Sequence, residues 1–283
     1  MTKAHTDEAL VLHEGSVHSA DDARIGFHRL GEGPALVFVH GSVATHTDWL
    51  PVAKILARQY TCILIDRRGR GRSSFGPAEY SMATECEDIA TVLGAVQAKI
   101  GTAAALIGHS YGATCCLEAA LHLKDTHLAI PRLAVYEPVL SIAAPIAGAY
   151  LGPYCEAVAS NDLDRAVQIG MEHFIRYNAE EIAALRSSRA WKRLHALAPS
   201  WGRELRVMDE LDPSVERFRQ LDCPVLLIRG SESPEHPMLR TARELAAVLP
   251  HVQAEVLHGQ NHMGMRLEPG AVAAMIDGFV RSA

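Results

Sequence analysis

The most informative segment of the chain is AAALIGHSYGATCCLEAA, residues 103–120. It begins with a continuous apolar run, which is the pattern of a strand buried on both faces. It continues into a helical pattern from about Ala113 onward. The two parts are joined by GHSYG, residues 108–112, so we predict a strand, a tight turn and a helix in direct succession.

This turn has the form G-x-S-x-G, with Ser110 at its centre. A strained backbone at the serine crowds the residues two positions before and after it, which explains the two glycines. Such a turn lifts the serine hydroxyl above the sheet edge, at the N-terminus of the following helix. The helix dipole and free amides there favour a developing oxyanion, so Ser110 is the candidate nucleophile.

The alternation of short apolar runs with helical patterns extends over most of the chain. Apolar runs occupy residues 36–39, 62–65, 133–136, 225–228 and, more mixed, 254–257. Helical patterns occupy residues 48–60, 82–100, 237–249 and 268–281. Residues 9–13 and 24–30 indicate an antiparallel opening pair. The sequence therefore predicts an α/β fold, with a mostly parallel eight-stranded sheet and helices on both faces.

Residues 139–220 interrupt this pattern, because they contain no convincing strand. Amphipathic segments lie around residues 150–158, 163–177, 180–197 and 201–211. We interpret residues 139–220 as a helical insertion, a cap, between two pieces of one core, residues 1–138 and 221–283. The cap is not expected to fold alone, because its apolar faces need the sheet edge to cover them.

A serine hydroxyl needs a base to act as a nucleophile. The best placed is His262, in GQNH after the last predicted strand, at the same sheet edge as Ser110. His258 is the alternative, but it ends the strand and suits a structural role better. The side chain of His109 must point away from that of Ser110. For the oxyanion we expect the backbone N–H groups of Ser42 and Tyr111 as donors.

Taken together, these motifs resemble the α/β-hydrolase fold superfamily over nearly the whole chain. His40-Gly41 resembles its oxyanion-loop motif, and DRRGRGRS, residues 66–73, resembles its D-x-x-G-x-G-x-S loop. That loop explains the arginine cluster as a structural turn. The resemblance also covers the nucleophile turn, the histidine loop and the helical cap, and it implies a serine hydrolase.

The third member of the implied triad departs from the commonest pattern of the superfamily. Ser233 occupies the position where an Asp is usual, and a serine cannot balance an imidazolium. Glu137, at the end of the sixth predicted strand, and Glu232 are the two candidates. We favour Glu137, because some members place their acid at this strand end. The acid fixes the histidine tautomer and stabilises its cation.

The expected chemistry is cleavage of an ester, thioester or lactone through an acyl-enzyme on Ser110. The substrate is expected to be small to medium in size and hydrophobic, because the candidate pocket walls are apolar. These wall candidates are Val43, Tyr111, Val139, Leu140, Trp191, Met263 and Met265.

Other chemistries of the same fold stay open: acyl transfer, C–C bond hydrolysis, lyase chemistry, and a non-catalytic protein that binds a small ligand. Epoxide hydrolases and haloalkane dehalogenases are disfavoured, because they need Asp where this chain has Ser110.

Composition excludes several other classes. The net charge is −6 and no basic stripe is present, so nucleic acid is not an expected partner. No dinucleotide or phosphate-loop motif and no metal-ligand spacing occur, so no cofactor or metal is expected. No apolar run is long enough for a membrane span, and no signal-peptide pattern is seen, so a cytoplasmic location is expected. A monomer and a homodimer both stay open.

Overall fold

The computed structural model describes residues 11–128 and 130–282. One eight-stranded sheet has the order β1-β2-β4-β3-β5-β6-β7-β8. Its strands are β1 (His13–His18), β2 (Arg24–Leu30), β3 (Ala35–Val39), β4 (Thr61–Ile65), β5 (Ala105–His109), β6 (Leu133–Tyr136), β7 (Val225–Gly230) and β8 (Val252–Leu257). β2 is antiparallel to β1 and β4, and all other pairs are parallel, which confirms the predicted mixed sheet.

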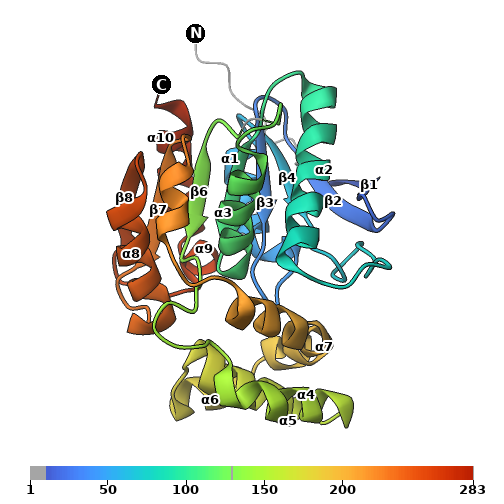
Figure 1. Cartoon of the computed structure of the whole chain (residues 1–283), viewed down its shortest axis with the longest axis vertical. Coiled ribbons are helices and arrows are strands. Elements are labelled where there is room, and N and C mark those ends of the chain that lie inside the picture. The colour runs from blue at the N-terminus through green and yellow to red at the C-terminus, as the bar shows by residue number, and fades with distance from the viewer. Residues whose placement is uncertain (1–10, 129, 283) are drawn as a thin grey trace.

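Helices cover both faces of this sheet (Figure 1). One face packs against α2 (Met82–Ile100), α3 (Tyr111–Leu123) and α8 (Arg240–Val248). The other packs against α1 (Leu50–Leu56), α9 (Gly264–Leu267) and α10 (Pro269–Arg281). Neighbouring residues of a strand enter opposite cores: Val37 lies in the first and Phe38 in the second. Burial on both faces explains why these strands are continuous apolar runs.

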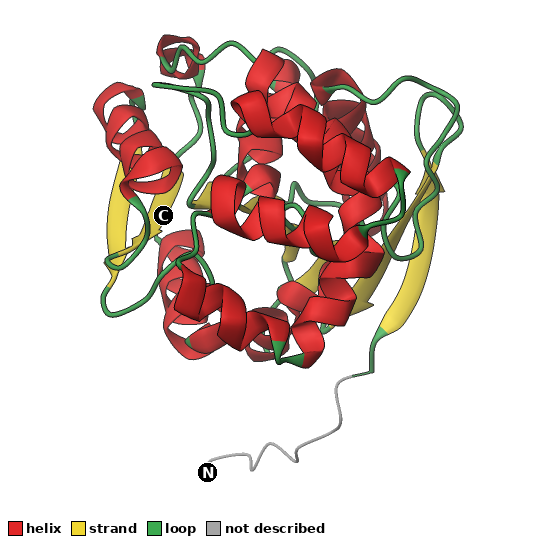
Figure 2. Ribbon diagram, turned by 90° about the horizontal axis from the view of Figure 1, so that it is seen from below, coloured by secondary structure: helices red, strands yellow, loops and turns green. Residues whose placement is uncertain are grey.

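The chain between β6 and β7 is helical and contains no strand among its described residues. It holds α4 (Leu151–Ala159), α5 (Leu163–Ile169), α6 (Ala179–Arg186) and α7 (Arg189–Glu210), with short helical turns η2 (Gly148–Tyr150), η3 (Gly170–Ile175) and η4 (Glu216–Gln220). In Figure 1 helices α4–α7 lie below the sheet, and Figure 2 views the molecule from that side. We refer to residues 139–220 as the cap.

Helix boundaries inside the cap differ from the prediction. The sequence suggested helices at residues 180–197 and 201–211, whereas α6 ends at Arg186 and α7 runs unbroken through Pro199. The side chain of Ser188 caps α7 by accepting from the backbone N–H of Ala190. An internal proline removes one helical hydrogen bond. Burial of Ala198 and Trp201 on either side of it offsets that loss.

The N-terminal strand and two later helices also differ from their predicted ranges. β1 spans His13–His18 instead of residues 9–13, of which 9 and 10 lie outside the described residues. The apolar signal came from the residues just before this strand, and β1 itself is an exposed edge strand. The predicted helix 48–60 is a short turn, η1 (His46–Asp48), followed by α1. Similarly, the predicted helix 237–249 is a turn, η5 (Glu235–Leu239), followed by α8.

None of the described helices combines the length and apolar character that crossing a bilayer needs.

Candidate active site

The predicted turn joins β5 to α3, and Ser110 stands at its apex. Its backbone has φ 56° and ψ −129°, a conformation that few L-residues adopt. The turn is held by a hydrogen bond of 2.9 Å from the N–H of Ser110 to the carbonyl oxygen of Tyr136. A Cβ atom on Gly112 would lie 2.3 Å from the carbonyl oxygen of His40, so only glycine fits there. The structure therefore has the crowding that the sequence implied.

His262 and Glu137 meet beside this turn. Nδ1 of His262 lies 2.6 Å from Oε2 of Glu137, which is fully buried. The second oxygen of Glu137 accepts a hydrogen bond of 2.7 Å from the N–H of Gly230. Glu232 is exposed, and its carboxylate contacts Ser231 instead. Of the two acid candidates, the structure thus brings Glu137 to the histidine.

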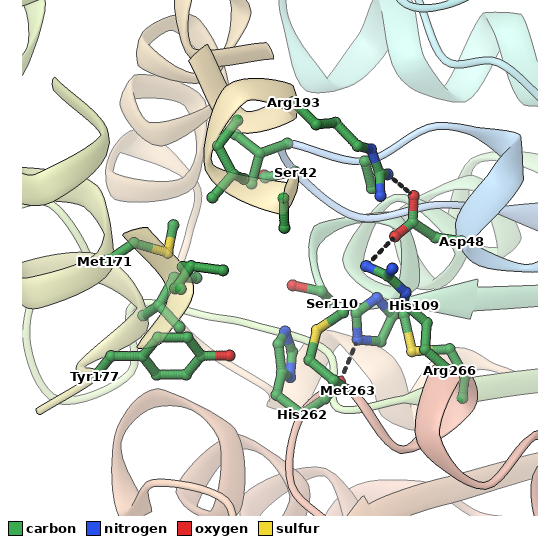
Figure 3. A pocket seen from close by; sticks show the side chains of 17 residues that line it. Ser42, Asp48, His109, Ser110, Met171, Tyr177, Arg193, His262, Met263 and Arg266 are labelled. Atoms are coloured by element: carbon green, nitrogen blue, oxygen red, sulfur yellow. Dashed lines mark hydrogen bonds and ion pairs between the residues drawn. The ribbon is translucent and has the colours of Figure 1, made fainter. Parts of the chain in front are cut away.

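The side chains of Ser110 and His262 line one cavity and lie next to each other (Figure 3). Because Nδ1 donates to Glu137, Nε2 is the ring nitrogen left to accept a proton. The hydrogen bonds of the described residues do not include one between Ser110 and His262. Contacts of this kind often tighten only when substrate binds.

His109 hydrogen-bonds to the loop that carries His262. Its Nε2 lies 2.8 Å from the carbonyl oxygen of His262, and the two rings are 4.5 Å apart. Burial, followed by the nearby His262, holds the pKa of His109 well below its usual range. It is therefore a neutral donor that fixes the position of His262, a role that the sequence did not suggest. The alternative base, His258, is exposed and lines neither cavity at Ser110.

The residues expected to supply the oxyanion donors, Ser42 and Tyr111, lie beside Ser110. Tyr111 begins α3, so its N–H has no partner within the helix. Ser42 follows Gly41, where an added Cβ would lie 2.8 Å from the Cβ of Ser110, so the absence of a side chain lets this loop approach the nucleophile. His40 anchors the loop: its Nδ1 donates to the carbonyl of Gly41 at 2.8 Å. Burial first, and then the charge of Arg67, lower the pKa of His40 to about 3.

Arg67 ties this oxyanion loop to the rest of the fold. Its guanidinium donates to the carbonyl of Gly41 at 3.2 Å and lies 4.7 Å above the ring of Tyr111. It also pairs with Glu85 of α2 at 2.7 Å and with Glu204 of α7 at 2.8 Å. The arginine-rich loop is a structural turn beside the site, as the sequence indicated. Its link to the cap through Glu204 was not foreseen.

Two cavities meet at Ser110. The larger, about 180 Å³, is lined by the predicted Val43, Met263 and Met265. Its wall also includes residues that were not predicted, among them Asp48, Met171, Tyr177, Arg193 and Arg266. The smaller, about 20 Å³, is lined by the predicted Val139 and has room for little more than one water molecule.

Trp191 was predicted to line the pocket, but it lines neither cavity, so this prediction was wrong. Its side chain is buried inside the cap, and its Nε1 donates to Asp164 at 2.7 Å. Tyr111 and Leu140 are likewise core residues and do not line the cavities. An aromatic residue on an amphipathic helix of the cap can pack either against the other cap helices or against the sheet. The sequence does not show which of these two contacts Trp191 makes.

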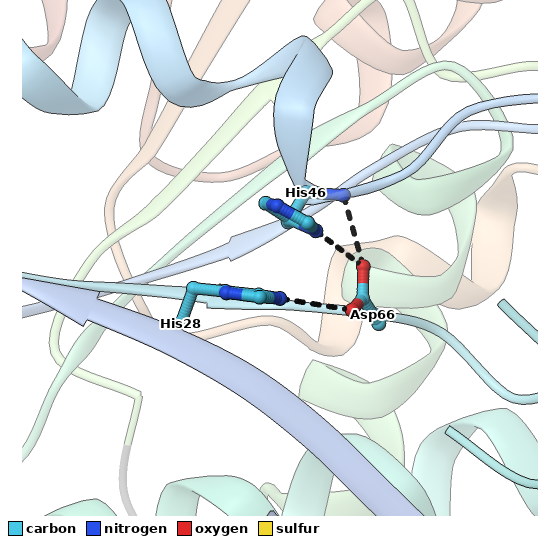
Figure 4. Close-up of side chains that lie close together, drawn as sticks. All are labelled: His28, His46 and Asp66. Atoms are coloured by element: carbon cyan, nitrogen blue, oxygen red, sulfur yellow. Dashed lines mark hydrogen bonds and ion pairs between the residues drawn. The ribbon is translucent and has the colours of Figure 1, made fainter. Parts of the chain in front are cut away.

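One group of potential metal ligands occurs in residues 11–128 and 130–282: His28, His46 and Asp66 (Figure 4). The two rings stack 3.5 Å apart, and each donates to one oxygen of Asp66, at 3.1 Å and 2.8 Å. Burial raises the pKa of the Asp66 carboxyl, but the hydrogen bonds from His46 and Arg72 outweigh it and lower the pKa overall. Because both histidines already hydrogen-bond to Asp66, we interpret the group as a hydrogen-bonded support of the loop that carries Asp66.

Comparison with known proteins places this chain in a family. The sequence profile described as alpha/beta hydrolase family matches residues 36–275. The crystal structure of an alpha/beta hydrolase from Sphaerobacter thermophilus is 30% identical, with a TM-score of 0.83, over 94% of this chain and 100% of that one. The chain therefore belongs to the alpha/beta hydrolase family.

Two further relatives carry names that describe an activity. An enol-lactonase from Burkholderia xenovorans LB400 has a TM-score of 0.76 and 16% identity, over 94% of this chain and 99% of that one, which shows the shared fold. An epoxide hydrolase from Caballeronia sordidicola is 37% identical over 106 residues, which are 37% of this chain and 32% of that protein.

Proposed function

We propose that this protein is a serine hydrolase that cleaves an ester, thioester or lactone of a small to medium hydrophobic substrate. The observation that carries the proposal is the buried pair of Glu137 and His262, which are 2.6 Å apart beside Ser110 on its strained turn. This arrangement matches a nucleophile, a base and an orienting acid.

In the acylation step, His262 Nε2 accepts the proton of Ser110 as the hydroxyl oxygen attacks the carbonyl carbon of the substrate. The negative charge that develops on the carbonyl oxygen is stabilised by the N–H groups of Ser42 and Tyr111. The C–O or C–S bond then breaks, and His262 gives its proton to the leaving group. Glu137 stabilises the imidazolium while it exists and does not itself take the proton.

In the deacylation step, His262 accepts a proton from water, whose oxygen attacks the carbonyl carbon of the acyl-enzyme. The bond between this carbon and Ser110 breaks, the serine oxygen recovers the proton, and a carboxylic acid leaves. With a lactone the leaving alcohol stays attached to the acyl group, so a single hydroxy acid is released.

The cavities support a substrate of limited size. The apolar and thioether side chains of Val43, Met171 and Met263 suit a flexible apolar group in the larger cavity. The smaller cavity, about 20 Å³, takes only a small substituent on the other side of Ser110.

The epoxide hydrolase relative suggests a second activity, but the nucleophile argues against it. The superfamily enzymes of that type need Asp where this chain has Ser110. Acyl transfer, C–C bond hydrolysis and lyase chemistry use the same triad, and they differ in which acceptor or substrate bond reacts. A ligand-binding protein without turnover is the remaining alternative.

The test compares Ser110→Ala with Ser214→Ala, an exposed serine far along the chain. On p-nitrophenyl esters of graded chain length and on simple lactones, Ser110→Ala should lose about 10⁴-fold or more in kcat. Ser214→Ala should keep wild-type rates. A fluorophosphonate should label the wild type and not Ser110→Ala. Full turnover by Ser110→Ala, or ligand-induced stabilisation without any turnover by the wild type, would reject the proposal.

A further inference from the structure

Two arginines, one from the cap and one from the core, line the larger cavity. Arg193 comes from α7 of the cap, and Arg266 from α9, four residues after His262. Both line the cavity that contains Ser110 (Figure 3). Both also contact one carboxylate: Arg193 Nη2 pairs with Asp48, and Arg266 Nη1 lies 3.4 Å from its other oxygen.

This corner of the cavity carries an excess of positive charge. Asp48 is buried and fixed in place, since it also accepts a hydrogen bond of 3.1 Å from the N–H of Thr45. One carboxylate thus faces two guanidinium groups, which leaves a formal charge of +1. The other ionisable residues of the cavity wall are His109, which is neutral, His262 and Tyr177. None of them supplies a second carboxylate.

Each guanidinium keeps donors that Asp48 does not use. A guanidinium has five N–H donors, and Arg193 and Arg266 each direct one of them at Asp48. Their side chains are 33% and 43% exposed, so neither is sealed inside the protein. A planar guanidinium fork matches the two oxygens of a carboxylate. The corner can therefore accept a second anion.

The remaining wall of the cavity is largely apolar, with Ile175 and Leu194 beside the methionines. A purely hydrocarbon substrate would fill this wall but would offer no partner to the guanidinium donors that Asp48 leaves free. A substrate with an apolar chain and one terminal carboxylate would complement both features. The reacting carbonyl would lie at Ser110, and the carboxylate at the arginines.

We propose that Arg193 and Arg266 bind a carboxylate of the substrate, so that the preferred substrates are half-esters of dicarboxylic acids or lactones that carry a carboxylate. This inference rests on the proposed function of Ser110 for the identity of the reacting group. It goes beyond that function by naming a recognition site and the charge of the substrate.

The experiment uses substrates that differ in one charge. The mono-p-nitrophenyl esters of succinic, glutaric and adipic acid are compared with the same compounds methylated at the free carboxylate. For the best of the three chain lengths, Arg193→Gln and Arg266→Gln should each lower kcat/KM about tenfold more on the half-ester than on its methyl ester, as expected for a charge-assisted hydrogen bond. Arg189→Gln is the matched control, because Arg189 is an exposed arginine of the same helix outside the cavity. Arg189→Gln should change kcat/KM by the same factor on the half-ester and on its methyl ester.

A second measurement does not depend on turnover. Binding of the half-ester and the methyl ester to Ser110→Ala is followed by calorimetry, alone and combined with each arginine change. The arginine changes should weaken the half-ester about tenfold more than the methyl ester. Arginine-dependent binding without wild-type turnover would leave this inference standing and reject the proposed function.

A different set of results would overturn the inference about the two arginines and leave the proposed function of Ser110 standing. Ser110-dependent turnover with equal losses on both esters, and equal changes in Kd, would mean that the two arginines only hold the cap against Asp48. The same conclusion would follow if the wild type favoured every methyl ester over its half-ester.

Discussion

Two of the three residues proposed as the triad have backbones that L-residues seldom adopt. Ser110 has φ 56° and Glu137 has φ 46°. Each such conformation costs on the order of 1–3 kcal/mol, so it persists only where neighbouring bonds hold it. The N–H of Ser110 donates to Tyr136, and that of Glu137 donates to Ile228, both at 2.9 Å. The next strand of the sheet therefore holds each strained residue, and both side chains reach the same edge.

At this scale we predict different outcomes for the two glutamates. Glu137→Gln should lower kcat by about 10³–10⁴-fold, because a neutral amide neither orients His262 nor stabilises its cation. Glu232→Gln should stay within about twofold of the wild type, since it is an exposed surface change. Initial rates on the best p-nitrophenyl ester give both numbers, and circular dichroism checks folding. Small, equal losses in the two variants would reject Glu137 as the acid.

Elements with strong local signals were predicted well. Helix α2 spans Met82–Ile100, the range expected from the sequence, because a capping box at Ser81 starts it and Gly101 in the left-handed conformation ends it. The region of helix α7 was predicted as parts of two segments, residues 180–197 and 201–211, whereas α7 runs unbroken through Pro199, a residue that locally disfavours a helix interior. Burial of Trp201 and its neighbours against the rest of the cap overrides that signal, and no local pattern encodes such packing.

The buried charges that join α7 to the core were also invisible in the sequence. Glu204 faces both Arg67 and Arg70, each at 2.8 Å, and all three side chains are almost fully buried. Burial alone would lower the pKa of Arg67, but Glu204 and Glu85 raise it well above its usual value. These partners are far apart along the chain, so only the docking of the cap brings them together.

This network leads to a prediction for the cap helix. Glu204→Gln should destabilise the protein by about 3–5 kcal/mol, because it leaves the buried guanidinium of Arg70 without a compensating charge and leaves Arg67 with Glu85 alone. Glu210→Gln, an exposed residue at the end of the same helix, should change stability by less than about 0.5 kcal/mol. Urea unfolding followed by tryptophan fluorescence measures both. Equal stability of the two variants would show that Glu204 contributes no net electrostatic stabilisation.

For the molecule as a whole, the sequence indicated which residues of the core meet at the candidate site better than it indicated the shape of the cavity. Ser110, Glu137 and His262 follow three strands that end at one sheet edge, so local motifs and the parallel topology suffice to place them together. Tyr177 and Arg193 enter the cavity from the cap. Their positions depend on how cap and core pack, which periodicity does not specify. This is why Trp191 was placed in the pocket and Arg193 was missed.

Stability should depend on pH through two buried, neutral histidines, His40 and His109. The pKa of His40 is about 3 in the folded protein, and that of His109 is also lowered. In the unfolded chain both have a pKa of about 6.5 and bind protons that the folded state excludes. Above about pH 6.5 the two histidines therefore do not lower the free energy of unfolding. They lower it progressively as the pH falls from 6.5 toward 3. Each histidine adds a slope of up to about 1.4 kcal/mol per pH unit.

The variant His109→Gln removes one of the two titrating histidines and so tests the contribution of His109 separately. Its side-chain amide can still donate to the carbonyl of His262, but it does not titrate. Between pH 7 and pH 5, the decrease in unfolding free energy should therefore be smaller than in the wild type, by an amount that approaches about 1.4 kcal/mol per pH unit toward pH 5. His258→Gln, at an exposed position, should follow the wild-type curve. Urea unfolding at pH 8, 7, 6 and 5 gives the slopes, and parallel curves for wild type and His109→Gln would mean that the folded protein protonates His109 as readily as the unfolded chain does.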